Sequence, residues 1–330
     1  LINNAERPLV LVGQGVELGN AQSELRAFIE KADMPAGCTL LGLSALPTDH
    51  PLNKGMLGMH GNLGPNINTN KCDVLIAVGM RFDDRVTGNL ATYAKQAKVI
   101  HFDIDPAEVN KNVKVDIAVL GDCKNTLAAV TGLLKENKHT EWNDSFKEYE
   151  KVEEEKVIRP ELYPATDSLT MGEVARAVSE ATHHEAVLVT DVGQNQIWSC
   201  GYHIVKKGKF LTSGGMGTMG YSIPAAMGAK TAAMDKQVIA VCGDGSFQMS
   251  MMELATIRQH RIPVKIIVLK NNYLGMVREY QHYTYKDHYS VVDLSGSPDL
   301  EKLSAAYGIP YLRLNTMEHA DEVLDAFLAE

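Results

Sequence analysis

The sequence lacks long apolar runs and any basic cluster, and each absence excludes a class of protein. No apolar run approaches the roughly 20 residues that a membrane-spanning helix needs. The formal net charge is −9, which argues against a nucleic-acid-binding surface. The first residues, Leu1-Ile2-Asn3-Asn4, are neither a signal peptide nor an initiator sequence, so we expect the chain to begin within a longer protein.

Cysteine is also scarce. The cysteines show neither a CxxC spacing nor the even count of a disulfide framework: Cys38, Cys72, Cys123, Cys200 and Cys242. Most lie in or beside apolar runs, so we expect reduced, buried thiols rather than catalytic ones. Together with the missing targeting segment, this favours a bacterial-type cytoplasm or an organellar stroma or matrix.

What is present is an alternation of strand-like and helix-like patterns over 330 residues, with 45% hydrophobic and 22% charged residues. Apolar runs predict strands at residues 8–12, 73–79, 98–105, 117–120, 186–192, 237–242 and 263–269, and helical spacing predicts helices at 21–32, 125–134, 169–181, 223–233 and 247–259. This alternation predicts an α/β protein with two doubly wound parallel-sheet domains, residues 1–137 and 169–330. The charged stretch 138–168 between them reads as an exposed helix or linker.

The most informative stretch is residues 241–276. A glycine turn, Gly243-Asp244-Gly245, follows one predicted strand, and Asn271 follows the next. The carboxyl ends of neighbouring parallel strands form the ligand crevice of such sheets. A carboxylate and an amide beside a glycine turn suit a magnesium ion carrying a diphosphate. The alternative is a structural turn in which Asp244 only caps a helix.

Charged loops follow two predicted strands of the first half. In the run from Arg81 to Gly88, two guanidinium groups can hold a diphosphate while Asp83 and Asp84 orient them, or the loop is only a solvated set of ion pairs. Asp103 and Asp105 follow the next strand, where a carboxylate can accept a hydrogen bond from a ribose or an adenine edge. The alternative is a helix cap, because residues 106–108 are typical of a first helical turn.

These motifs resemble a known family. The spacing from Asp244 to the asparagine pair resembles the thiamine diphosphate (ThDP) signature, and the segments GMHG, GMRFDDRVTG, FDIDPAE, DVGQNQ and SGGMGTMG resemble acetolactate synthase (acetohydroxyacid synthase) large subunits. The resemblance implies a central FAD-binding, Rossmann-like domain followed by a ThDP diphosphate-binding domain. It implies Mg²⁺ held by the side chains of Asp244 and Asn271 and by the backbone oxygen of Tyr273. Asn195 replaces the usual histidine, and Lys270 stands where the family has an asparagine.

The resemblance also implies two sets of cofactor contacts. The ThDP contacts are Val192, Gly193, Gln194, Asn195, Gly217, Met219, Gly243, Asp244, Gly245, Ser246, Asn271, Tyr273, Gly275 and Met276. The contacts to a structural FAD are Gly13, Gln14, Gly15, Thr39, Leu40, Gly58, Met59, His60, Gly79, Arg81, Asp83, Arg85, Val86, Asp103, Ile104, Gly121 and Asp122. Without the resemblance, His60 is an ordinary loop histidine.

The chemistry implied is a transferase reaction. The Gly217 carbonyl and the Met219 backbone hold the aminopyrimidine, the Met219 side chain bends the cofactor, and Arg85 faces the active site. Pyruvate is decarboxylated and joined to a second 2-keto acid, pyruvate or 2-ketobutyrate, in the first common step of isoleucine, valine and leucine biosynthesis. Tyr280 stands where the family commonly has a tryptophan that favours 2-ketobutyrate, although an aromatic residue at a helical position is equally often part of the core.

The resemblance further implies a homodimer or homotetramer of large subunits and a small regulatory subunit. In that family an N-terminal domain donates the glutamate that contacts the pyrimidine across the dimer interface. No glutamate of this chain matches it, and the chain ends inside a helix that the family follows with a last strand. We therefore expect the chain alone to bind cofactors better than it turns over. The alternatives are a pyruvate oxidase or glyoxylate carboligase type of enzyme, and a non-catalytic nucleotide-binding module.

Overall fold

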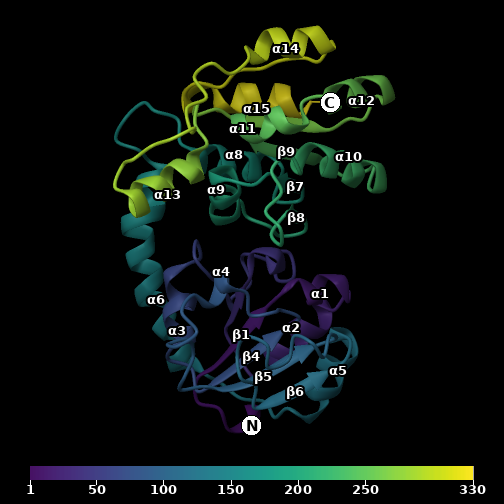
Figure 1. The fold of residues 1–330 in the computed structure, drawn as a ribbon. Helices are drawn as coiled ribbons and strands as arrows, with labels where there is room; N and C mark the ends of the chain where they lie inside the picture. The colour runs from purple at the N-terminus through teal and green to yellow at the C-terminus, as the bar shows by residue number, and fades with distance from the viewer. Residues whose placement is uncertain (330) are drawn as a thin grey trace. The chain divides into compact units, whose positions relative to one another are not determined.

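A computed structural model of the chain describes residues 1–329. The chain divides into two compact units, Leu1–Pro160 and the residues from Glu161 onward, and each is described here by itself (Figure 1). Both units are parallel sheets with helices on their two faces, so the predicted α/β class is confirmed. Between residues 1 and 329, no helix has the length and apolarity that crossing a membrane requires.

The first unit contains a six-stranded parallel sheet in the order β3-β2-β1-β4-β5-β6. The strands are β1 (Pro8–Val12), β2 (Ala36–Cys38), β3 (Asn53–Met56), β4 (Val74–Val78), β5 (Lys98–Asp103) and β6 (Ile117–Leu120). The four strands predicted here are confirmed. Strands β2 and β3 escaped prediction because three or four residues such as Ala-Gly-Cys carry no periodicity of their own.

The helices of this unit cover both faces of the sheet. They are η1 (Ile2–Asn4), α1 (Gln14–Leu18), α2 (Gln22–Lys31), η2 (Leu40–Gly42), α3 (Leu63–Thr69), α4 (Asp84–Thr87), α5 (Cys123–Leu133) and α6 (Thr140–Glu153). Val10 of β1 packs in the cluster that contains Phe28 of α2, whereas Leu9 packs in the cluster that contains Phe146 of α6. Neighbouring residues of a strand therefore enter different cores, which explains the continuous apolar runs of these strands.

Helix α6 is the helix alternative of our expectation for residues 138–168, but one of its faces is buried. It packs along α3 and buries Trp142 and Phe146, one helical turn apart, in the core of the first unit. The indole Nε1 of Trp142 donates to the Pro8 carbonyl over 2.7 Å. Two aromatic residues among many charges were too few to predict burial, but each covers a large apolar area. The compact units divide at Pro160 and Glu161, inside the expected linker.

The second unit contains a four-stranded parallel sheet in the order β10-β9-β7-β8. The strands are β7 (Val187–Thr190), β8 (Lys209–Thr212), β9 (Val238–Gly243) and β10 (Lys265–Leu269). The short helix η3 (Glu154–Ile158) belongs to the first unit, and α7 (Arg159–Leu162) spans the junction. The helices of the second unit are then α8 (Met171–Ala181), α9 (Gln194–Tyr202), α10 (Ser222–Ala232), α11 (Asp244–Ser250), α12 (Glu253–His260), α13 (Gly275–Tyr285), α14 (Leu300–Tyr307), η4 (Met317–His319) and α15 (Ala320–Leu328).

Helices lie on both faces of this sheet as well. Val189 of β7 packs with Ala226 of α10, while Leu188 lines the opposite face with Val178 of α8 (Figure 1). Helix α8 begins with a capping box between Thr170 and Glu173. The helix expected over residues 247–259 forms as two helices, α11 and α12.

His203, just after α9, is buried against α8 and the sheet and lines a cavity of about 10 Å³, room for about one water molecule. Burial lowers the pKa of His203 to about 4. Between pH 6.5 and 4, the His203 side chain therefore binds a proton in the unfolded chain but stays neutral in the folded unit. The free energy of unfolding decreases as the pH falls through this window.

We expect His203 to account for about 3 kcal/mol of this loss. Thermal unfolding between pH 7 and 4.5 should show a shallower pH dependence in His203→Gln than in the wild type. His183→Gln, at an exposed position, is the control and should keep the wild-type slope. Equal slopes in all three proteins would contradict the assignment.

Candidate functional site

The C-terminal ends of β9 and β10 bring Asp244 and Asn271 into adjacent turns. Leu269 pairs with Gly243, so the residues that follow the two strands lie side by side. One carboxylate oxygen of Asp244 accepts the backbone N–H of Asn272 over 2.8 Å, and the other accepts the N–H of Gly245 over 3.1 Å. The carboxylate thus spans both turns, as the sequence pattern suggested.

These groups fit a magnesium ion that also binds phosphate. Asp244 is only 3% exposed, and burial raises the pKa of its carboxyl group. The Asn271 side-chain oxygen accepts the Tyr273 N–H over 2.9 Å and keeps a second lone pair. Among residues 1–329, no three His, Cys, Asp or Glu side chains gather as a metal site. An ion at this edge would need oxygens from its ligand, which is how magnesium usually binds.

The end of β7 forms the neighbouring turn. Gly193 has φ +135°, a conformation that L side chains rarely adopt, and α9 begins directly after it. The first N–H groups of a helix point outward and suit phosphate oxygens. Asn195 is buried and donates from Nδ2 to the Val241 carbonyl over 3.2 Å, so part of its hydrogen-bonding capacity is used within the fold.

Gln194 connects this turn to α13. Its Nε2 donates to Glu279 over 3.0 Å, and a Cβ added at Gly275 would lie 2.1 Å from its Oε1. A side chain at position 275 would therefore displace the Gln194 amide from its present place. A cavity of about 310 Å³ opens here, lined by Gln194, Asn271, Tyr273, Gly275, Arg278, Glu279, His282, Tyr283 and Tyr289.

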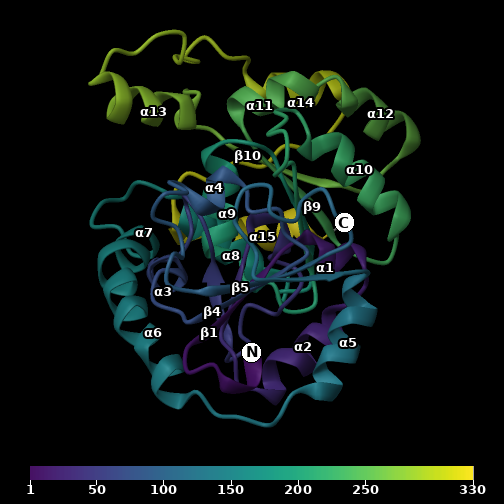
Figure 2. The same cartoon turned by 60° about the horizontal axis from the view of Figure 1, so that its bottom comes forward.

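Helix α13 carries Tyr280, for which the sequence left two alternatives, and Arg278, which the sequence did not single out. It buries no residue, and Figures 1 and 2 both show it at the margin of the second unit. Tyr280 is exposed and meets Tyr285 edge to face, so it is not a core residue. Sequence reasoning missed Arg278, whose guanidinium lies 4.3 Å from the ring centre of Tyr273 and 4.8 Å from that of Tyr289. The spacing of these three residues gave no periodic signal.

The loop after β8 carries Gly217 and Met219. Gly217 is exposed with φ +64°, and Met219 is partly buried. Together with the turns after β7, β9 and β10, this loop places every expected ThDP-contact residue at the C-terminal end of one of the four strands of one sheet or in the segment that follows it. The individual contacts stay a prediction.

In the first unit, the strand order changes direction between β1 and β4, which is where such sheets bind dinucleotides. The turn Gly13-Gln14-Gly15 follows β1, and Gly79 follows β4. A Cβ at Gly13 would lie 2.2 Å from the Gly79 carbonyl oxygen. The glycines are therefore required by the close approach of two backbone turns, with or without a ligand.

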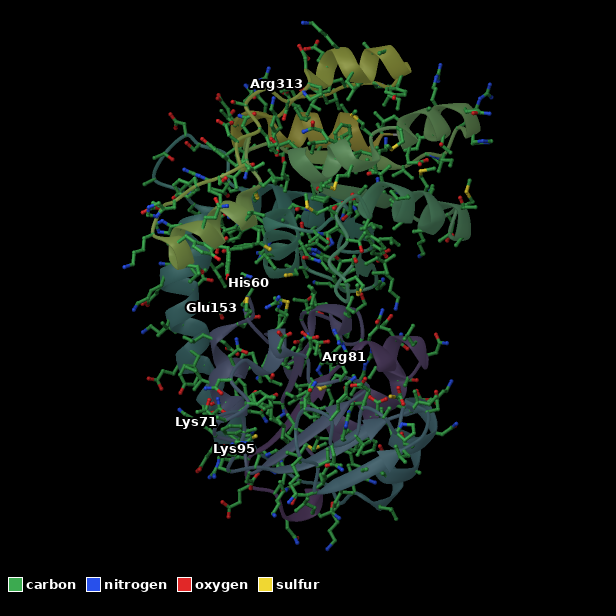
Figure 3. The ribbon with its side chains drawn as sticks, in the orientation of Figure 1. His60, Lys71, Arg81, Lys95, Glu153 and Arg313 are labelled. Atoms are coloured by element: carbon green, nitrogen blue, oxygen red, sulfur yellow. The ribbon has the colours of Figure 1, made fainter. Side chains whose placement is uncertain are left out.

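The two arginines of the loop after β4 differ in their ion pairing. Arg81 forms an ion pair with Asp83, which also caps α4, whereas Arg85 is 72% exposed and lies 3.9 Å from Asp84. In Figure 3, Arg81 and His60 lie toward the same end of the first unit. Two guanidinium groups at this end fit an anionic ligand group, and the carboxylates orient one of them firmly.

Several aspartates of this unit accept hydrogen bonds from backbone N–H groups. Asp103 accepts the Asp105 N–H over 2.9 Å, and Asp122 caps α5. Asp105 accepts the Ala107 N–H, and residues 106–110 form turns, not the first helical turn that the helix-cap alternative implied.

Two large apolar side chains in these loops are exposed, Met59 at 63% and Ile104 at 71%. Apolar surface of this kind beside glycine turns fits the ring system of a dinucleotide. The FAD contacts expected from the sequence therefore have a matching surface, and they too stay a prediction.

Two family models match the chain. The central domain of thiamine pyrophosphate enzymes matches residues 1–130, and their C-terminal TPP binding domain matches residues 191–330. The first matched region contains the six-stranded sheet and the second contains β8, β9 and β10 of the other sheet, so the fold agrees with both. The class is therefore that of the thiamine pyrophosphate (ThDP) enzymes.

Similar individual proteins identify the family within this class of enzymes. A probable acetolactate synthase large subunit of Methanocaldococcus jannaschii is 41% identical over 98% of this chain, and the isozyme 2 large subunit of Escherichia coli is 38% identical over 99%. The acetolactate synthase large subunit of Lactococcus lactis is 41% identical over 94%. The chain belongs to the acetolactate synthase large-subunit family. It spans about half the length of these relatives, 54% to 59%.

Proposed function

We propose that this chain supplies the FAD-binding and the ThDP–Mg²⁺-binding parts of an acetolactate synthase, which joins pyruvate to a second 2-keto acid. The observation that carries the proposal is the shared turn geometry of Asp244 and Asn271 at the ends of β9 and β10. The matches to the central and C-terminal domains of ThDP enzymes support it, as do relatives near 40% identity over almost the whole chain.

Different residues of the second unit would bind Mg²⁺, the diphosphate and the aminopyrimidine. Asp244, Asn271 and the Tyr273 carbonyl would hold Mg²⁺, while the N-termini of α9 and α11 would offer N–H groups to the diphosphate. The Gly217 carbonyl and the Met219 backbone would orient the aminopyrimidine. When bound, ThDP supplies the carbon nucleophile and the electron sink for decarboxylation. The protein positions it and excludes water.

In the first unit, the turns after β1, β4 and β5 would bind FAD, whose role is structural because carboligation involves no net redox change. Arg85, the more exposed arginine of its loop, is proposed for an anionic substrate group. Tyr280 would line the pocket of the second substrate. A tyrosine there leaves the choice between pyruvate and 2-ketobutyrate to experiment.

The relatives are named large subunits. We therefore propose a homodimeric or homotetrameric enzyme with a small regulatory subunit, acting in branched-chain amino acid biosynthesis.

A product assay tests the reaction. With pyruvate, Mg²⁺, ThDP and FAD, the holoenzyme should form acetolactate. Hydrogen peroxide from pyruvate, or tartronate semialdehyde from glyoxylate, would instead indicate an oxidase or a glyoxylate carboligase. A chain that binds none of the cofactors in calorimetry would be a non-catalytic module, and the proposal would fail.

A further inference from the structure

A buried carboxylate, Asp191, joins two loops at the C-terminal edge of the second sheet. We propose that Asp191 is a positioning residue: it fixes the loop that carries Met219, residues 213–221, in the shape that the aminopyrimidine of ThDP requires. This inference rests on the proposed function, because it concerns the same cofactor site.

All the contacts of Asp191 reach backbone or hydroxyl donors. One oxygen accepts the N–H groups of Val192 and Gly220, each over 2.9 Å. The other accepts the N–H of Ser222 over 2.8 Å and its hydroxyl over 2.7 Å. Asp191 and Ser222 are both fully buried. A buried carboxylate with four donors is a strong and specific anchor, since hydrogen bonds to a charged group are worth roughly twice those between neutral ones.

These contacts bracket Met219. The Thr218 N–H donates to Ser213 Oγ over 3.0 Å, and the next fixed amide is that of Gly220, bound to Asp191. Residues 214–218 are exposed, so apolar packing does little to fix this part of the loop. The backbone on both sides of Met219 is therefore set by two polar anchors.

A second buried connection runs beside the first. Gln196 of α9 donates from Nε2 to the hydroxyl of Thr212 over 2.6 Å, and that hydroxyl donates to the Thr190 carbonyl over 3.3 Å. The end of β8 is thus tied to the end of β7 and to α9. The Asp191 N–H also donates to the Val241 carbonyl over 2.8 Å, which fixes Asp191 itself on β9. The anchor is rigid on the sheet side, so the loop is the part that it positions.

The charge and shape of aspartate are both needed. An asparagine at position 191 would keep one acceptor oxygen and would turn an NH₂ group toward either Gly220 or Ser222. In either orientation, a backbone N–H that holds the loop, that of Gly220 or that of Ser222, would face another donor and lose its partner. The loop would loosen although the sheet is unchanged.

The test compares Asp191→Asn and Ser222→Ala with the wild type, and Asp299→Asn serves as the matched control. Asp299 caps α14 in the same unit with the same chemistry, and asparagine is an equally good cap. Hydrogen–deuterium exchange of peptides covering residues 213–222 reports the loop directly. We expect exchange in Asp191→Asn to rise on the order of tenfold or more and to rise less in Ser222→Ala.

Calorimetry adds a readout that a general loss of structure would not produce. Asp191→Asn should weaken binding of Mg²⁺–ThDP on the order of tenfold. Binding of Mg²⁺–pyrophosphate, which has no pyrimidine, should weaken clearly less, and any loss would come from the Val192 N–H that Asp191 also accepts. Should Asp191→Asn fail to fold, Ser222→Ala carries the test, because it removes one donor and keeps the carboxylate.

Equal losses for ThDP and pyrophosphate, or unchanged exchange and unchanged ThDP affinity, would overturn the inference and leave the proposed function standing. A wild type that binds neither probe would overturn the proposed function. Exchange of the loop would still decide whether Asp191 holds it.

Discussion

Replacing Asp244 by alanine is expected to abolish Mg²⁺-dependent binding of ThDP, with a loss of affinity on the order of 100-fold or more. Asp244 is the single carboxylate among the proposed metal ligands, and neutral amide and carbonyl oxygens cannot replace its charge. Without cofactor, the variant should remain folded but be less stable, because the N–H groups of Asn272 and Gly245 lose their acceptor. Calorimetry with Mg²⁺ and ThDP measures the first effect and thermal unfolding the second.

Asp299→Ala is the control for this experiment. It removes a helix cap in the same unit and should lower the free energy of unfolding by about 1 kcal/mol without changing ThDP affinity. If Asp244→Ala bound Mg²⁺–ThDP as the wild type does, the metal site would lie elsewhere.

Gly13→Ala should lower the free energy of unfolding of the first unit by about 3 kcal/mol or more. The new methyl group would lie 2.2 Å from the Gly79 carbonyl oxygen and 2.4 Å from Met80 Cβ, so the backbone turns after β1 and β4 would have to separate. For a unit of this size, the melting temperature should fall by roughly 10 °C. Trp142 fluorescence in a Trp198→Phe background reports this unit, since the chain has only two tryptophans.

Gly132→Ala provides the matched comparison. Gly132 lies in α5 with open space where its Cβ would stand, so alanine should stabilise this unit by about 0.5–1 kcal/mol. A Gly13→Ala protein as stable as the wild type would mean that the two turns can separate without cost.

Local sequence patterns predicted most of the sheet strands but not the course of every segment between them. The apolar runs at residues 8–12 and 117–120 match β1 and β6 residue for residue. The glycine turns also marked the ends of predicted strands correctly. The buried face of the helix over residues 140–153 was not predicted, because burial of Trp142 depends on a carbonyl more than 130 residues away.

The same difference between local patterns and contacts of distant residues applies to the site. The positions of Asp244 and Asn271 after two strands could be predicted from the sequence, because side-chain type and position after a strand are local properties. The importance of Asp191 was not. Its carboxylate acts on amides about 30 residues further along the chain, and no local pattern records that distance.

By itself, the sequence determined the α/β class, most of the strands and the residue types available at the strand ends, since these follow from short-range apolar periodicity and glycine turns. The tertiary structure alone decided the strand order, which turns lie side by side, and which polar groups are buried together. Those features depend on contacts between distant segments, where burial and hydrogen bonding outweigh local preference.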